Sequence, residues 1–159
     1  MRVAVVAVGR VRGVLEPAVR DYEERAGRYW KLDVIEVAAG APGGAKGGDA
    51  AARVRRAEAD RILGALPDGL EVVALTRTGR PTSSRELAAY LEELGTRAHP
   101  GAAFVIGGAF GLDASVLERA RRALSLSALT LPHEMARLVL AEQLYRAGTL
   151  VRGEPYHKS

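Results

Sequence analysis

Two segments in the last third of this 159-residue chain carry residues that suit ligand binding. The first is the cluster Gly-Gly-Ala-Phe-Gly at 107–111, directly after the apolar run 102–106. An apolar run, a glycine turn and a helix start bring backbone close to nucleotide-like ligands in α/β sheets. The cluster has neither a G-x-G-x-x-G order nor the Lys-Ser/Thr of a P-loop, so it does not predict a triphosphate site. A tight turn without a ligand explains the glycines equally well.

The second segment, 124–133, places small hydroxyl residues between leucines and ends in Pro132-His133. Taken alone, this pattern favours a central strand whose hydroxyls bond to backbone. Pro132 can end that strand, because it has no N–H to donate. His133 then lies near a helix N-terminus, where the helix dipole disfavours a charged imidazole. A plain structural cap is the alternative role for His133.

The tail, 155–159, reads Pro-Tyr-His-Lys-Ser. Tyr156 can stack on a base, and His157 titrates near neutral pH, so both suit RNA chemistry. A packing role for the tail is equally compatible with the pattern. Arg146, on the preceding apolar segment, suits either solvent exposure or a phosphate contact.

The composition narrows the class of protein. A net charge of +4 suits an anionic partner such as RNA without requiring one. The chain has no cysteine, and its three histidines have no close ligand spacing, so we expect no disulfide and no metal. No run approaches the roughly 18 apolar residues that cross a membrane, and the N-terminus lacks a signal-peptide pattern. We therefore expect a cytoplasmic protein that does not enter the membrane.

The elements that would position these residues alternate between strand and helix. Apolar runs predict five strands, at 3–8, 32–37, 70–75, 102–106 and 126–130. Helical patterns lie between and after them, at 16–29, 49–66, 83–94, 113 or 115 to 123, and 134–147. The loop 39–48 and the tail 148–159 show no periodicity. This order predicts a single α/β domain over 1–159, with a mostly parallel sheet flanked by helices.

Two consequences follow for the site and for assembly. Ligands bind such sheets at the carboxyl ends of strands, here 75–76, 106–107 and 130–131. The last helix is apolar over a surface wider than one core-facing stripe. We expect the excess surface to form a homodimer interface, with packing under the tail as the alternative.

The whole chain resembles the RlmH family of bacterial ribosomal RNA methyltransferases, small members of the SPOUT superfamily. The resemblance is carried by 8–10, Leu75, 79–80, 83–84, the turn 106–111, the run 124–133, 142–147 and the tail 155–158. It implies a C-terminal trefoil knot, a rare exception among folds, and a homodimer. It also implies methyl transfer from S-adenosylmethionine to N3 of a pseudouridine in 23S rRNA, with the assembled ribosome as substrate.

The resemblance also implies site residues. The cofactor contacts fall on Leu75, Gly107, Leu126, Ser127, Ala128, Leu129, Thr130 and Leu131. Catalysis would consist mostly of positioning N3 in line with the methyl group. His157 or His133 is the candidate base for the N3 proton, and Tyr156 and Arg146 would place the base and a phosphate. In a dimer, the tail of one subunit would complete the cofactor pocket of the other.

The chain departs from the family pattern at three places. Thr76 follows Leu75 where an acidic residue is expected, and Arg10 and Arg80 stand where lysine is common. The loop 40–48 has a single basic residue, Lys46, so we expect no RNA contact from it. The alternative functions are a SPOUT methyltransferase acting on tRNA, a non-catalytic ribosome-binding factor, and a small-molecule-binding domain without an RNA partner.

Overall fold

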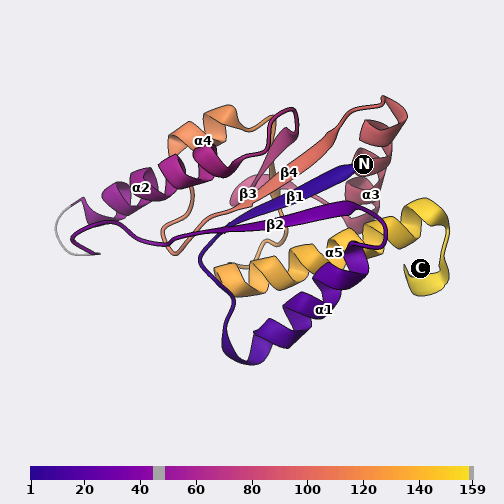
Figure 1. Cartoon of the computed structure of the whole chain (residues 1–159), viewed down its shortest axis with the longest axis horizontal. Coiled ribbons are helices and arrows are strands. Elements are labelled where there is room, and N and C mark those ends of the chain that lie inside the picture. The colour runs from indigo at the N-terminus through magenta and orange to yellow at the C-terminus, as the bar shows by residue number, and fades with distance from the viewer. Residues whose placement is uncertain (45–48, 158–159) are drawn as a thin grey trace.

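A computed structural model describes residues 1–44 and 49–157 and shows a central sheet covered by helices on both faces (Figure 1). The strands are β1 (Arg2–Val8), β2 (Lys31–Val37), β3 (Glu71–Pro81), β4 (Gly101–Ile106) and β5 (Arg122–Ser125). Their order in the sheet is β2-β1-β4-β3-β5, and every pairing is parallel. The predicted α/β class with a parallel sheet is confirmed.

Helices form two layers around this sheet. They are α1 (Glu16–Ala26), α2 (Ala50–Ala65), α3 (Ser84–Thr96), α4 (Ala114–Arg119) and α5 (His133–Arg152), with short 3₁₀ turns η1 (Gly13–Leu15) and η2 (Pro155–His157). Helices α1, α3 and α5 pack on one face, and α2 and α4 pack on the other (Figure 1). Among the described residues, no helix is long and apolar enough to span a membrane.

The continuous apolar runs of the central strands follow from this double cover. Val3 and Val5 of β1 pack against the layer that contains α1, α3 and α5, whereas Val6 and Val8 pack against α2 and α4. Successive side chains of a strand point to opposite faces, so a strand covered on both sides must be apolar at every position. Phe104 of β4 is fully buried between these layers.

The helix starts follow local capping chemistry. Ser83 forms the predicted capping box at α3: its hydroxyl accepts from the Glu86 amide at 3.1 Å, and Glu86 accepts from the Ser83 amide at 2.7 Å. Asp113 caps α4 by accepting from the Ser115 amide at 3.1 Å. Asp49 stands at the N-cap of α2 as predicted, but its side chain makes no capping hydrogen bond.

The predicted fifth strand at 126–130 is wrong. The strand is β5, at Arg122–Ser125, and 126–131 form a loop. Helix α4 ends at Arg119, and extended backbone at Ala120 carries the chain into the sheet early. Past β5, the Ser125 hydroxyl donates to the Ser127 carbonyl at 2.9 Å, and the Ser127 hydroxyl accepts from the Leu129 amide at 2.9 Å. These local bonds replace those of a strand ladder.

The C-terminal end is also more ordered than its pattern predicts. Helix α5 continues to Arg152 instead of ending at 147, because residues 147–149 are buried, with Gly148 against Tyr29 in the turn that follows α1. Gly153 then ends the helix in the left-handed conformation, at φ 67°. The following turn, η2, lays the Tyr156 ring 4.6 Å from that of Tyr145, so the tail through 157 is not irregular. Lys158 and Ser159 lie outside the described residues.

Smaller differences concern the ends of other elements. Helix α1 ends at Ala26 instead of 29, and α4 ends at Arg119 instead of 123. Strand β3 continues to Pro81 instead of ending at 75, because 80–81 pair again with β5 after a register shift. Lys46, the single basic residue expected in the loop 40–48, lies outside the part that the structure describes.

Candidate active site

Three neighbouring strands meet at one pocket. In the order β4-β3-β5, it is lined by Ile106 and Gly107 at the end of β4, by Leu75, the last residue of β3 that pairs with β4, and by Ser125 at the end of β5. Parallel strands bring their carboxyl ends to one edge of a sheet, which is where ligands bind in such folds. The predicted positions 75–76, 106–107 and 130–131 all line this pocket, but of these only Ile106 ends a strand there, because β3 continues to Pro81 and 130–131 lie in the loop after β5.

The loop 126–131 and the start of α5 form the other wall of this pocket. The loop and α5 residues on it are Leu126, Ser127, Leu129, Thr130, Leu131, His133 and Ala136. Together with Leu75 and Gly107, seven of the eight residues predicted to contact a cofactor lie around one cavity. The exception is Ala128, which lines a second hollow that shares Ser125, Leu126 and Ser127 with the first.

The glycine turn has almost no spare volume. A Cβ on Gly107 would lie 3.0 Å from the backbone carbon and oxygen of Gly111 and 3.0 Å from Cδ2 of Leu112. A Cβ on Gly108 would lie 2.9 Å from a carboxylate oxygen of Glu58. The turn is thus both tightly packed and part of the pocket wall. Its glycines therefore suit a tight turn and a ligand-binding wall at the same time.

The loop offers its backbone to the pocket because it is not a strand. Among residues 1–44 and 49–157, no backbone–backbone hydrogen bond involves 127–131. The Ser127 carbonyl and the Leu129 amide bond to the hydroxyls of Ser125 and Ser127, and the other polar backbone groups of this loop are left to solvent or a ligand. The wall also carries the apolar side chains of Leu75, Leu126 and Leu131. Apolar walls with a few polar groups are typical of small-molecule and cofactor sites.

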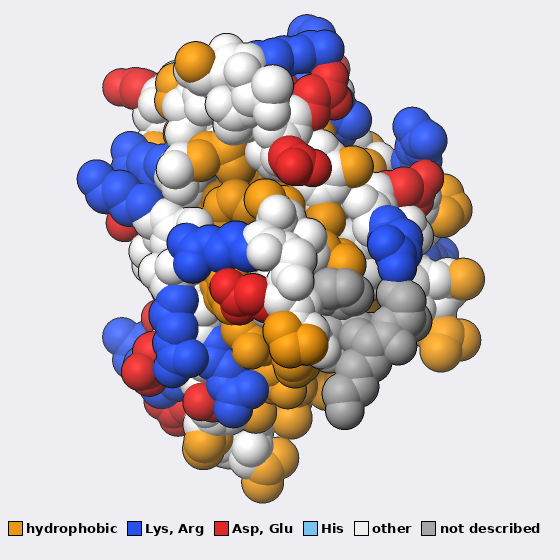
Figure 2. Space-filling model, turned by 90° about the vertical axis from the view of Figure 1, so that its right-hand side faces the viewer, with side chains coloured by type: hydrophobic (Ala, Val, Ile, Leu, Met, Phe, Trp, Pro, Cys, Tyr) orange, Lys and Arg blue, Asp and Glu red, His pale blue; other side chains and the backbone are white. Residues whose placement is uncertain are grey.

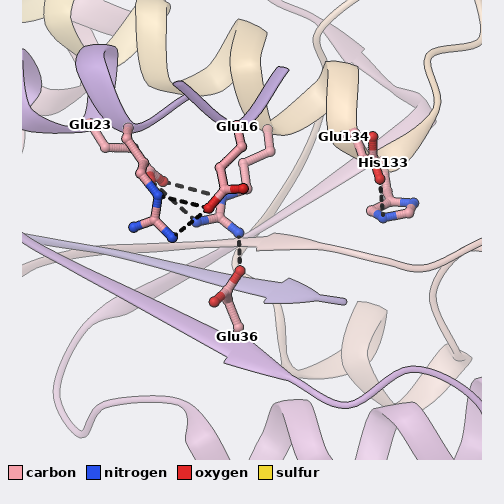
Figure 3. Close-up of polar contacts among 7 residues, drawn as sticks. Glu16, Glu23, Glu36, His133 and Glu134 are labelled. Atoms are coloured by element: carbon pink, nitrogen blue, oxygen red, sulfur yellow. Dashed lines mark hydrogen bonds and ion pairs between the residues drawn. The ribbon is translucent and has the colours of Figure 1, made fainter. Parts of the chain in front are cut away.

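His133 lies at the N-terminal end of α5, against the end of β1. A Cβ on Gly9 would be 3.5 Å from its Nε2 atom, and Gly9 has a φ of 84°. The same Nε2 lies 4.0 Å from Oε1 of Glu134 (Figure 3). The imidazole is half-buried and lines the pocket, so it can reach a ligand there.

A buried ion-pair cluster fixes the first turns of α5. Arg137, only 8% exposed, donates to Oε2 of Glu36 at 2.6 Å and to both carboxylate oxygens of Glu23 at 3.2 Å. Figure 3 shows Glu23 and Glu36 converging from α1 and β2. Burial lowers the pKa of Arg137, but its bonds to Glu23 and Glu36 outweigh that effect and raise it. The cluster thereby holds the start of α5, including His133, against α1 and β2.

Tyr156 and Arg146 form a second cluster at the far end of α5. Both bond to Oε1 of Glu142: Arg146 through Nε at 3.0 Å and Nη2 at 2.6 Å, and the Tyr156 hydroxyl at 3.1 Å. The Arg146 guanidinium also lies 5.0 Å from the centre of the Tyr156 ring. Burial, then hydrogen bonds with Tyr22 and Glu142, raise the pKa of Tyr156. Its phenol is therefore neutral at physiological pH.

Within one chain, this cluster is remote from the pocket. His133 and Arg146 are separated by 13 residues of a continuous helix, or about 20 Å along its axis. The described structure does not bring the predicted catalytic residues together: His133 is at the pocket, and Arg146 and Tyr156 are not. The side chain of His157 lies outside the described part of the chain.

The face that contains the end of α5 carries charges of both signs. Figure 2 shows this side, with Lys and Arg interleaved with Asp and Glu around exposed apolar side chains. Arg146 is one of the paired cations, through Glu142. The cluster is therefore not a uniformly basic surface. The Arg146 guanidinium already pairs with Glu142, and a phosphate that contacts Arg146 would compete with that carboxylate.

Comparison with known proteins decides the family. A model described as "Predicted SPOUT methyltransferase" matches residues 1–157. The chain belongs to the SPOUT methyltransferase family. It is therefore a methyltransferase enzyme, and the family implies a methyl donor.

Relatives of this SPOUT methyltransferase match over its full length. A protein of Gemmatimonas aurantiaca named ribosomal RNA large subunit methyltransferase H is 52% identical, covering 99% of this chain and all of the relative. A protein of the same name from Anaeromyxobacter is 44% identical over the same shares. A probable methyltransferase from Bordetella pertussis is a similar solved structure, with a TM-score of 0.56 and 20% identity over 92% of this chain and 94% of that one. That likeness supports the fold.

Several pocket residues of the SPOUT methyltransferase were not found from the sequence. They are Arg77, Leu112 and Ala136. Arg77 directly follows an expected strand end, 75–76, which is a signal that could have found it. Leu112 and Ala136 come from segments beyond the strand ends, and only the tertiary fold brings them in. The described residues contain no cluster of three or more His, Cys, Asp or Glu that could hold a metal ion.

Proposed function

We propose that this SPOUT methyltransferase transfers a methyl group from S-adenosylmethionine to N3 of a pseudouridine in 23S rRNA of the assembled ribosome. The observation that carries the proposal is the convergence of Leu75, Gly107 and the loop 126–131 on one pocket. The full-length relatives named ribosomal RNA large subunit methyltransferase H support the choice of substrate. Because the proposed substrate is the ribosome, we expect the enzyme to act in the cytoplasm.

The pocket suits the proposed cofactor. S-adenosylmethionine supplies a methyl group activated by a positively charged sulfonium. The backbone of the loop 126–131 offers amides and carbonyls that can bind an adenine edge or ribose hydroxyls. Leu75, Leu126 and Leu131 cover apolar surface and exclude water. Gly107 lets the wall close tightly beside the ligand.

Proton removal from N3 is the second task of the site. A neutral pseudouridine carries a proton at N3, so a base within hydrogen-bond reach helps the transfer. We propose that one of His133 and His157 accepts it. His133 lines the pocket, which supports its candidacy. If turnover stays unchanged at every pH in both His133→Ala and His157→Ala, neither histidine is the base that accepts the N3 proton.

A second copy of the chain would complete the site. The roughly 20 Å along α5 between His133 and Arg146 prevents one chain from using both ends of the helix at one methyl group. We propose a homodimer in which Tyr156 and Arg146 of one subunit lie beside the pocket of the other. Mixing Gly107→Arg subunits with subunits truncated after 152 tests this arrangement. Each is inactive alone in this scheme, and the mixture regains part of the activity; a mixture without activity contradicts it.

The connection between β5 and α5 is proposed to form a trefoil knot, within one domain over 1–159. The chain leaves β5 through the loop 126–131, and α5 then packs between α1 and α3 on one face of the sheet (Figure 1). A knot would fix that loop against the glycine turn and preorganise the pocket. Refolding from urea that is far slower than the refolding of an unknotted control would support this account.

Methyl transfer from labelled S-adenosylmethionine tests the function directly. Unmodified ribosomes, isolated large subunits, naked rRNA and bulk tRNA are offered in parallel, and the label is mapped by nuclease digestion. We expect label at N3 of a pseudouridine in 23S rRNA only when ribosomes are supplied. Label in tRNA would favour the tRNA methyltransferase alternative. Ribosome binding without transfer would favour a non-catalytic binding factor.

A further inference from the structure

Strand β3 contains a bulge beside the pocket. It pairs with β5 at Leu75–Leu124, and the pairing resumes at Arg80–Leu124, so 76–79 are extra residues on one strand. A Cβ on Gly79 would lie 2.7 Å from the Leu124 backbone, which shows how closely the bulge returns to β5. Bulges commonly redirect a side chain next to an active site. Here the redirected segment carries Arg77.

Arg77 stands between two hollows. It lines the pocket at the strand ends and also the second hollow, together with Thr82, Ser127 and Ala128. Its Nη1 donates to the Thr130 hydroxyl at 3.0 Å, and its side chain is exposed. Among the described residues, the Thr130 hydroxyl is the only hydrogen-bond or ion-pair partner of Arg77, so no carboxylate neutralises the guanidinium.

The charge of Arg77 argues for an anion from outside the cofactor pocket. S-adenosylmethionine carries a sulfonium and an ammonium against one carboxylate, so an unpaired cation at the pocket wall opposes its binding. A phosphate in the second hollow would neutralise that cation. Arg77 and the Ser127 hydroxyl on the same hollow offer the donors that phosphate oxygens accept, whereas the Thr82 hydroxyl donates to the Arg80 carbonyl at 3.0 Å.

We propose that the hollow formed by Arg77, Thr82, Ser127 and Ala128 binds a phosphodiester of the substrate RNA next to the target nucleotide. The inference rests on the proposed function, because the phosphate belongs to the RNA that enters the pocket. Arg77 is then a residue that positions the substrate strand. Because its charge is neutralised by the RNA, substrate binding also removes an obstacle to the cofactor.

The test compares Arg77→Gln and Arg77→Lys with Arg119→Gln, which removes the same charge from α4, away from both hollows. KM for ribosomes, the salt dependence of ribosome binding, and Kd for S-adenosylmethionine are measured for each variant. We expect Arg77→Gln to raise KM about tenfold and to reduce the slope of log K against log salt by about one. Its Kd for the cofactor should not weaken. Arg77→Lys should recover part of the loss, and Arg119→Gln should behave like wild type.

Other outcomes overturn the proposal. Weaker cofactor binding with an unchanged KM would assign Arg77 to the cofactor carboxylate. Unchanged values for all three measurements would leave Arg77 without a ligand. A change in the molar mass of the assembly, measured by light scattering, would place Arg77 at a dimer interface instead. If the wild type binds ribosomes but transfers no methyl group, the proposed function fails, whereas the salt slopes still decide whether Arg77 contacts phosphate.

Discussion

The Tyr156 hydroxyl and the Glu142 carboxylate, 3.1 Å apart, connect the tail to α5. The same Glu142 oxygen accepts two hydrogen bonds from Arg146, so one carboxylate orients both proposed substrate-binding groups. Glu142→Gln removes the charge that holds Arg146 and weakens the bond to Tyr156. We expect kcat on ribosomes to fall about tenfold, with no change in Kd for S-adenosylmethionine. Glu118→Gln, on exposed α4, is the control, and equal loss in both variants would contradict a specific role for Glu142.

Alkaline pH should destabilise the fold through its tyrosines. Burial and then Glu71 raise the pKa of Tyr90, burial raises that of Tyr156, and a hydrogen bond with Glu154 raises that of Tyr29. A raised pKa in the folded state means that the unfolded chain loses its phenolic protons first, from about pH 10. The contribution of these groups to stability is therefore complete below about pH 10 and is lost as pH rises through their folded pKa values.

Absorbance at 295 nm checks this expectation. Of the five tyrosines in the chain, the folded protein should ionise fewer near pH 10 than the chain in guanidinium, and the rest should ionise together with unfolding. Circular dichroism on the same samples reports the fold. Ionisation of all five near pH 10 with unchanged circular dichroism would show that these phenols are not protected.

The fold was predictable where burial dictates the sequence. Strands β1 and β4 are buried on both faces, so their apolar runs were found to within one residue. The rule that ligands bind at carboxyl ends then located Leu75 and Gly107 at the pocket. The loop 126–131 was not predictable in this way, because alternating leucine and hydroxyl residues fit a strand and a loop equally. Its form depends on β5 pairing for only four residues before local hydroxyl bonds take over.

The relative positions of the candidate catalytic residues could not be predicted from the sequence. The sequence predicts catalytic roles for His133, Arg146 and Tyr156. It does not show that His133 lies at the start of α5, whereas Arg146 and Tyr156 lie near its other end. The helix continues to Arg152 because residues 147–149 are buried, with Gly148 against Tyr29, and such a contact arises only in the folded chain. Arg77 was missed for a related reason, since the bulge that directs it to the pocket arises from the pairing of β3 with β5.

The Arg137 cluster should contribute to stability far more than a surface ion pair does. Arg137→Leu leaves Glu23 and Glu36 without their buried partner, which should lower the free energy of unfolding by about 3 kcal/mol. Arg20→Leu, the same change in an exposed pair with Glu16, should cost less than about 1 kcal/mol. Urea unfolding followed by circular dichroism measures both. Equal losses would mean that burial of the Arg137 pair adds nothing.

Gly107→Ala should separate cofactor binding from folding. The new Cβ would lie 3.0 Å from the backbone of Gly111, so the turn must shift by a few tenths of an ångström at the pocket wall. We expect Kd for S-adenosylmethionine, measured by calorimetry, to rise about tenfold while the urea midpoint changes little. The matched control is Gly64→Ala at an exposed position of α2, where a Cβ meets no atom within 4 Å. That variant should keep the wild-type Kd and gain up to about 1 kcal/mol of stability from helix propensity. An unchanged Kd in Gly107→Ala would mean that the turn is tight for packing alone and that the cofactor does not depend on this wall.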